Sequence, residues 1–191
     1  MVLGYAYTAL DYIKEDRKRA LIFAIAIFGL IAAAFGVLGQ FIVFLLIVAT
    51  VVVAFFVGQF ELKKFGIELV TLTAVMSGFL YGPMVGAAVG AFLLTVHLIV
   101  AKSLGSYVLY CIPTMAVVGM LAGYAAGGGW FGGDIVMVGI ILSLVYNLIT
   151  AGLGTIVLGD FFNELLWSGT NFALNFVLFL KIAPAVLSVL V

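Results

Sequence analysis

Long stretches without a charged side chain constrain this chain more than any other feature of its sequence. Residues 20–60 contain no Asp, Glu, Lys or Arg. Over the whole chain 8% of the residues are charged and 66% are hydrophobic, whereas soluble domains are about one quarter charged. A surface so poor in charge indicates burial in lipid. We therefore expect an all-α integral membrane protein, because an apolar helix satisfies its backbone hydrogen bonds internally.

The apolar sequence is divided into segments of a length suited to a bilayer. A helix needs about 20 apolar residues to cross the hydrocarbon core. Charges, glycines and prolines separate seven such segments, which are 20–38, 41–59, 66–82, 84–101, 106–127, 135–158 and 163–183. The connections are short, and nothing indicates a second domain. We predict a polytopic bundle of six to seven transmembrane helices in a cell membrane, formed by residues 20–191 as one domain.

The first 19 residues differ in character from the rest. Charged side chains gather at 14–19, and Tyr5, Leu10, Tyr12 and Ile13 precede them. This pattern predicts an N-terminal interfacial amphipathic helix within residues 1–19 that contacts membrane lipid. The apolar run that follows is too long for the hydrophobic region of a secretory signal, so we expect no removed targeting peptide.

Alternation of the last five segments across the membrane sorts the polar residues onto two faces. The face that we call X holds Lys63, Lys64, Glu68, Lys102, Asp160, Asn163 and Glu164. The opposite face, Y, holds the Gly82-Pro83 turn, the GGGWFGG loop, Asp134 and Lys181. The positive-inside rule makes X cytoplasmic if both segments within 20–59 span, and Y cytoplasmic if only one does. The charges therefore leave the orientation open.

Small residues recur at four-residue spacing in several segments. Gly82, Gly86 and Gly90 form one series, and Gly119, Gly123 and Gly127 form another. Helices in lipid associate through close packing at such positions, so we predict intramolecular helix packing. The first segment presents a small-residue run that is our candidate surface for docking a partner protein, namely Ala32, Ala33 and Ala34.

Polar side chains inside apolar segments are costly and are therefore functional candidates. Five of them gather toward face X and the membrane centre in the predicted topology, namely Glu68, His97, Asn147, Asn171 and Asn175. We predict a polar funnel that binds a small zwitterionic or heterocyclic solute, with an entrance at Lys102, Asn163 and Glu164. The alternative is structural: Glu68 and Lys102 lie at helix ends, and the asparagines join helices.

The sequence lacks the residues that several other classes of function require. One His and one Cys cannot form a histidine-rich or thiolate metal centre, a haem site or an iron–sulfur site. No GxSxG or HExxH motif is present, so we expect no enzyme and no cofactor. The formal net charge is zero, which gives no basic surface for nucleic acid.

Several stretches after residue 66 follow the pattern of a known family. An apolar helix ends at Gly82-Pro83, the glycine-rich sequence GPMVGAAVGAF follows, a helix with Pro113 ends in small residues, and NELLWSGTNFALNF lies near the C-terminus. In these features the chain resembles the substrate-binding S component of energy-coupling factor (ECF) transporters. The resemblance implies a six-helix subunit that captures a vitamin- or micronutrient-like solute from outside, at face X. It also implies a transmembrane coupling subunit and ATPase subunits as partners, docked through the alanine run of the first segment.

Two other functions are compatible with the same residues. A non-transporting multi-pass subunit would scaffold a larger membrane complex through its small-residue faces. A self-contained channel or carrier is less favoured, because the sequence shows no inverted repeat.

Overall fold

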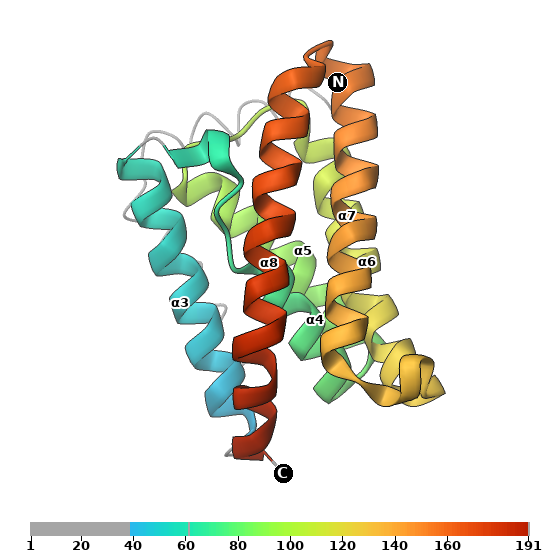
Figure 1. Cartoon of the computed structure of the whole chain (residues 1–191). Helices are drawn as coiled ribbons and strands as arrows, with labels where there is room; N and C mark the ends of the chain where they lie inside the picture. Colours follow the sequence, from blue (N-terminus) through green and yellow to red (C-terminus); the bar gives the residue numbers. More distant parts are fainter. Residues whose placement is uncertain (1–38, 61, 191) are drawn as a thin grey trace, which may run out of the picture.

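The computed structural model describes residues 39–60 and 62–190. In this part the chain forms six α-helices and two short 3₁₀ helices, and it contains no strand (Figure 1). The helices are α3 (Gly39–Gln59), η1 (Leu62–Phe65), α4 (Val70–Tyr81), α5 (Pro83–Val100), α6 (Val108–Gly128), η2 (Trp130–Gly133), α7 (Ile135–Leu158) and α8 (Phe161–Leu190). The predicted all-α fold is thus confirmed. The expected interfacial helix in 1–19, the segment 20–38 and the Ala32–Ala34 run lie outside the described residues.

Four of the described helices are long and apolar enough to cross a membrane. These are α5, α6, α7 and the stretch Phe161–Ser188 of α8. Their outward surfaces carry large apolar side chains that are exposed, such as Leu148 and Ile156 on α7 and Val177 on α8. Such a surface is suited to lipid rather than water. The chain is therefore a multi-pass membrane protein.

The third predicted span is wrong in its extent. The segment 66–82 is helical only over α4, which has 12 residues and is about 18 Å long, short of the roughly 30 Å core of a bilayer. Residues 66–69 are irregular, and Gly66 has a positive φ of 57°. Irregular backbone at membrane depth is tolerated where protein buries it, and here both Gly66 and Glu68 are buried.

Glycines bring the backbones of α4, α5 and α6 into direct contact. A Cβ atom on Gly86 or Gly119 would collide with the carbonyl group of the other, and a Cβ on Gly123 would collide with Pro83. A Cβ on Gly90 would lie 2.7 Å from the carbonyl oxygen of Met115. The predicted intramolecular packing is confirmed at these positions. Gly82 and Gly127, each at one end of its series, have open space beside them.

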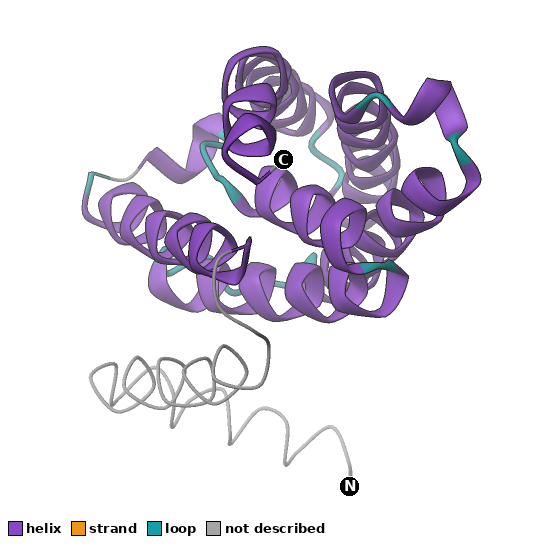
Figure 2. Ribbon diagram, turned by 90° about the horizontal axis from the view of Figure 1, so that it is seen from below, coloured by secondary structure: helices purple, strands orange, loops and turns teal. Residues whose placement is uncertain are grey.

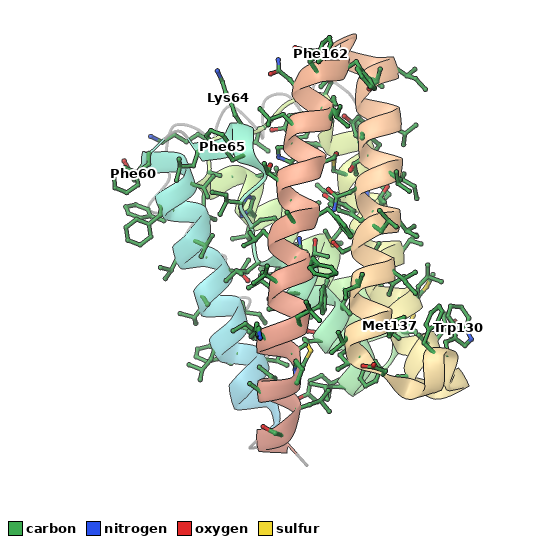
Figure 3. The ribbon with its side chains drawn as sticks, viewed as in Figure 1. Phe60, Lys64, Phe65, Trp130, Met137 and Phe162 are labelled. Atoms are coloured by element: carbon green, nitrogen blue, oxygen red, sulfur yellow. The ribbon has the colours of Figure 1, made fainter. Side chains whose placement is uncertain are left out.

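Residues assigned to faces X and Y lie toward opposite ends of the bundle, except that Glu68 lies deeper, beside Asn171 and Asn175. Figure 3 shows Phe60, Lys64 and Phe162 at one end, with Trp130 toward the other. Lys181 lies 17 residues beyond Glu164 on α8, which is about 25 Å along a helix axis. Figure 2 shows the described helices from below, and buried side chains such as Leu72 and Met115 belong to their shared hydrophobic core.

Candidate solute-binding site

A cavity of about 400 Å³ lies among the face X ends of the helices. Its walls come from α3, η1, α5, α6, α7 and α8 and from the connections that contain Glu68 and Ser103. A volume in this range is typical of sites for small organic molecules. The helices therefore form a space of suitable size at the end where the sequence predicts a funnel.

Acidic and basic groups meet around the cavity. Its lining includes two basic residues, two acidic residues and one imidazole, namely Lys64, Lys102, Glu68, Glu164 and His97. The structure thus brings together two predicted site residues, Glu68 and His97, and two predicted entrance residues, Lys102 and Glu164. The third entrance residue, Asn163, does not line the cavity. It is exposed and its side chain donates a hydrogen bond to Asp160.

Aromatic side chains form another part of the wall, which the sequence reasoning missed. They are Tyr107, Tyr110, Tyr146 and Trp167. The rings of Tyr146 and Trp167 pack edge to face, with centroids 6.4 Å apart. Burial raises the pKa of Tyr107, just before α6, to about 12, so its hydroxyl stays neutral. The cavity therefore offers apolar ring faces beside neutral and charged polar groups.

Glu68 lies at the cavity wall and at the start of α4. It is 3% exposed. Its Oε2 accepts a hydrogen bond from the Thr71 N–H (2.9 Å), and its Oε1 accepts one from the Thr71 hydroxyl (2.6 Å). The carboxylate thereby stabilises the N-terminal end of α4, where the helix dipole favours negative charge. Glu68 therefore joins the irregular segment that carries it to the first turn of α4.

The three predicted asparagines do not line the cavity but pack behind Glu68. Asn147 is 3% exposed, and Asn171 and Asn175 are completely buried. Asn171 Nδ2 donates to Glu68 Oε1 (3.1 Å), and Asn175 Nδ2 lies 3.3 Å from the same oxygen. Asn147 Nδ2 donates across the α7–α8 interface to Asn171 Oδ1 (2.9 Å). These amides join helices and surround the carboxylate.

Helix α8 also holds the irregular segment that carries Glu68. Asn171 Nδ2 donates to the carbonyl oxygen of Gly66 (2.7 Å), and the Thr170 hydroxyl donates to that of Phe65 (2.6 Å). These carbonyl groups precede α4 and are outside the hydrogen-bond pattern of a regular helix. Side chains of α8 therefore supply their donors. The asparagine network therefore positions Glu68 at the wall of the cavity.

His97 lies near the end of α5 and lines the cavity. It is 8% exposed, and its Nδ1 has no hydrogen-bond partner among the described residues. A neutral imidazole presents one donor and one acceptor nitrogen. His97 therefore retains hydrogen-bonding capacity that a bound molecule could use.

Cys111 is a buried free thiol in the same wall. Among the described residues, no group of three or more His, Cys, Asp or Glu side chains is arranged to hold a metal ion. The cavity wall presents hydrogen-bonding groups, charges and aromatic faces.

Comparison with protein-family models, with curated proteins and with solved structures finds no match for this chain. Its assignment as a multi-helix, multi-pass membrane protein with a polar and aromatic cavity thus comes from the sequence and the fold alone.

Proposed function

We propose that this chain is the substrate-capture subunit of an uptake system of the ECF type in a cell membrane. It binds a small micronutrient- or vitamin-like solute and performs no catalysis. The observation that carries the proposal is the cavity of about 400 Å³ at face X, whose wall combines charged, imidazole and aromatic side chains. The resemblance of residues 66 onward to S components supports it independently of that geometry.

The wall indicates the chemistry of the solute. Glu68 and Glu164 suit an amine or ring N–H, while Lys64 and Lys102 suit a carboxylate or phosphate. The edge-to-face pair of Tyr146 and Trp167 supports contact with a planar ring. A zwitterionic heterocycle would engage all three kinds of group.

The second candidate is a subunit that scaffolds a larger membrane complex. The exposed apolar side chains of α7 and α8 would serve protein contacts as well as lipid contacts. These surfaces are required of any multi-pass protein, whereas a cavity with charges of both signs is not. The cavity therefore favours solute binding over scaffolding.

Copurification tests the proposal directly. The full chain is expressed with its native partners, purified in detergent and denatured, and the released small molecules are identified by mass spectrometry. We expect one solute per chain, together with a transmembrane coupling subunit and ATPase subunits that bind in part through Ala32–Ala34. A purified complex that contains other proteins but no retained solute would favour the scaffold.

Matched lysine variants locate the solute. Lys102→Ala removes a charge from the cavity wall, whereas Lys181→Ala removes an exposed charge on the remote half of α8. We expect solute retention to fall at least about tenfold in Lys102→Ala, or about 1.4 kcal/mol, and to be unchanged in Lys181→Ala. Equal retention in both variants would show that the solute lies elsewhere.

A further inference from the structure

The loop between α6 and α7 exposes two large aromatic side chains toward the Y end of the bundle (Figure 3). Trp130 is 47% exposed and Phe131 is 51% exposed. A Cβ atom on Gly128 would lie 3.0 Å from Trp130 Nε1, so the indole lies against the end of α6. Its N–H donates no hydrogen bond to a described residue. The loop therefore presents an amphipathic ring whose donor is still available.

Phe131 has a backbone conformation that favours glycine. Its φ is 55°, in the left-handed region, and Gly129, Gly132 and Gly133 around it have φ values of 63°, 69° and 74°. Glycine adopts this region freely, whereas a residue with a Cβ is strained there. Because the ring is exposed, packing within the described chain does not offset this strain. Strained residues of this kind cluster at functional sites, so the ring indicates a contact beyond the described residues.

The lipid-facing surface of the bundle runs directly to this loop. On α7 the exposed side chains of Met137, Leu144 and Leu148 are spaced by seven and four residues, so they lie on one helical face. On α6 the exposed Val117 and Tyr124 are seven residues apart and lead to the same loop. These faces contact lipid in a multi-pass protein. The two rings therefore continue an apolar surface that lies against lipid.

The length of that surface places the loop at the edge of the hydrocarbon core. On α7 the exposed residues Met137 and Ile156 are 19 residues apart. This separation is about 28 Å along a helix axis, and it matches the roughly 30 Å core of a bilayer. Asp134, which caps the start of α7, and the loop before it follow Met137 toward face Y. The loop therefore lies just beyond the core.

Helix α8 gives the same limit. Asn147 and Asn171 are hydrogen-bonded across the antiparallel helices α7 and α8 (Figure 1). Lys181 lies ten residues after Asn171, as Met137 lies ten residues before Asn147. Lys181 is thus level with Met137, and it is exposed. A lysine at this level reaches the headgroups along its flexible stem.

Two occupants suit exposed aromatic rings at this level, namely the lipid headgroup region and a partner protein. Tryptophan is enriched at membrane–water interfaces, where its ring contacts apolar chains and its N–H bonds to headgroups or water. The loop is continuous with the lipid-facing surface and lies near the level of an exposed lysine. Both observations favour the headgroup region as the occupant.

We propose that the loop 129–133 is an interfacial anchor, in which Trp130 and Phe131 insert into the headgroup boundary of the leaflet at face Y. Together with Lys181 it fixes the depth of α6, α7 and α8 in the bilayer. The anchor does not rest on the proposed function, because it lies at the opposite end of the bundle from the cavity. It holds for either orientation of the chain.

Quenching of Trp130 by brominated lipid tests this depth. The full chain with Trp167→Phe has Trp130 as its only tryptophan, and it is reconstituted into phosphatidylcholine vesicles with bromine either near the headgroup or near the end of the acyl chain. We expect the shallow bromine to quench Trp130 at least about twofold more than the deep bromine, because an interfacial tryptophan lies at headgroup level. No quenching would place the ring in water or under a protein, and equal or stronger quenching by the deep bromine would place it in the core. Either result would overturn the proposal.

Phe131→Gly, made in the same background, separates anchoring from a structural role. Glycine adopts the φ of this position without strain, so Tm in detergent should not fall. Shallow quenching of Trp130 should fall by about half or more, because one of the two inserted rings is lost. Phe162→Ala is the control, because it removes an exposed ring at the opposite end and should leave the quenching unchanged. A lower Tm with unchanged quenching in Phe131→Gly would show that the ring is structural, and it would overturn the assignment of Phe131 to the anchor.

Discussion

Replacement of Asn171 by leucine should destabilise the protein even when no solute is present. The side chain makes four hydrogen bonds, through Nδ2 to Gly66 and Glu68 and through Oδ1 to Asn147 and Asn175. Its substitution leaves a backbone carbonyl group, a carboxylate and two amides with fewer partners. A site lined by solvated asparagines would tolerate the change, whereas a buried network does not.

The magnitude follows from the contacts. Hydrogen bonds between transmembrane helices contribute about 0.6 kcal/mol each on average. Three of the four bonds join α8 to other segments and the fourth, to Asn175, lies within α8, so together they contribute roughly 2 kcal/mol. The bond to a carboxylate is stronger than a neutral one, which raises the expected loss to about 3 kcal/mol. For a chain of this length, each kcal/mol shifts Tm by about 2–4 °C. We therefore expect Tm to fall by about 6–12 °C.

The assay is thermal unfolding of the purified protein in detergent, followed by size-exclusion chromatography of the remaining folded fraction. Asn163→Leu is the control, because Asn163 lies on the same helix but is exposed. The double variant Asn147→Leu, Asn171→Leu should lose less than the sum of the single losses, since the two residues share one bond. A Tm for Asn171→Leu within about 2 °C of the wild type would refute the network as a stabilising element.

Three further predictions concern packing and topology. Gly119→Leu should abolish a monodisperse folded species in size-exclusion chromatography because α5 and α6 touch there, while Gly127→Leu, with open space beside it, should retain that species. In a variant with Cys111 replaced by Ala, the single cysteines Lys102→Cys and Asp134→Cys should react with an impermeant maleimide from opposite sides of sealed vesicles. Labelling of both from the same side would contradict the alternation of the helices. A topology reporter fused after Gly105 should read external, and a cytoplasmic reading would contradict capture of a solute from outside at face X.

The helices were the most predictable part of the molecule, because residues close to each helix end determine where it begins and ends. The predicted segment 135–158 coincides with α7. Asp134 accepts a hydrogen bond from the Val136 N–H at its start, and Gly159 has a positive φ of 72° at its end. Charge and glycine mark these limits in the sequence itself. The all-α class was predictable as well, because a chain with so few charged residues lies in lipid, where an apolar helix satisfies its own backbone hydrogen bonds.

The interior of the site was less predictable, because it depends on how helices are rotated against one another. The spacing of Asn171 and Asn175 correctly placed them on one helical face, but it did not show whether that face meets a cavity or another helix. The irregular backbone before α4 results from contacts with α8, more than 100 residues later in the sequence. The aromatic residues of the cavity gave no signal, since tyrosine and tryptophan also face lipid in membrane proteins.

The cavity's role as a solute site is tested most directly by the fluorescence of its own tryptophan. The chain has two tryptophans: Trp167 lines the cavity, and Trp130 is exposed at the other end. In Trp130→Phe the only remaining tryptophan is Trp167 in the cavity. In Trp167→Phe the only one is Trp130 at the other end. When the small molecules extracted from the purified protein are returned to solute-depleted protein, emission should change saturably in Trp130→Phe and stay constant in Trp167→Phe. No change in either variant, or the same change in both, would contradict binding in the cavity.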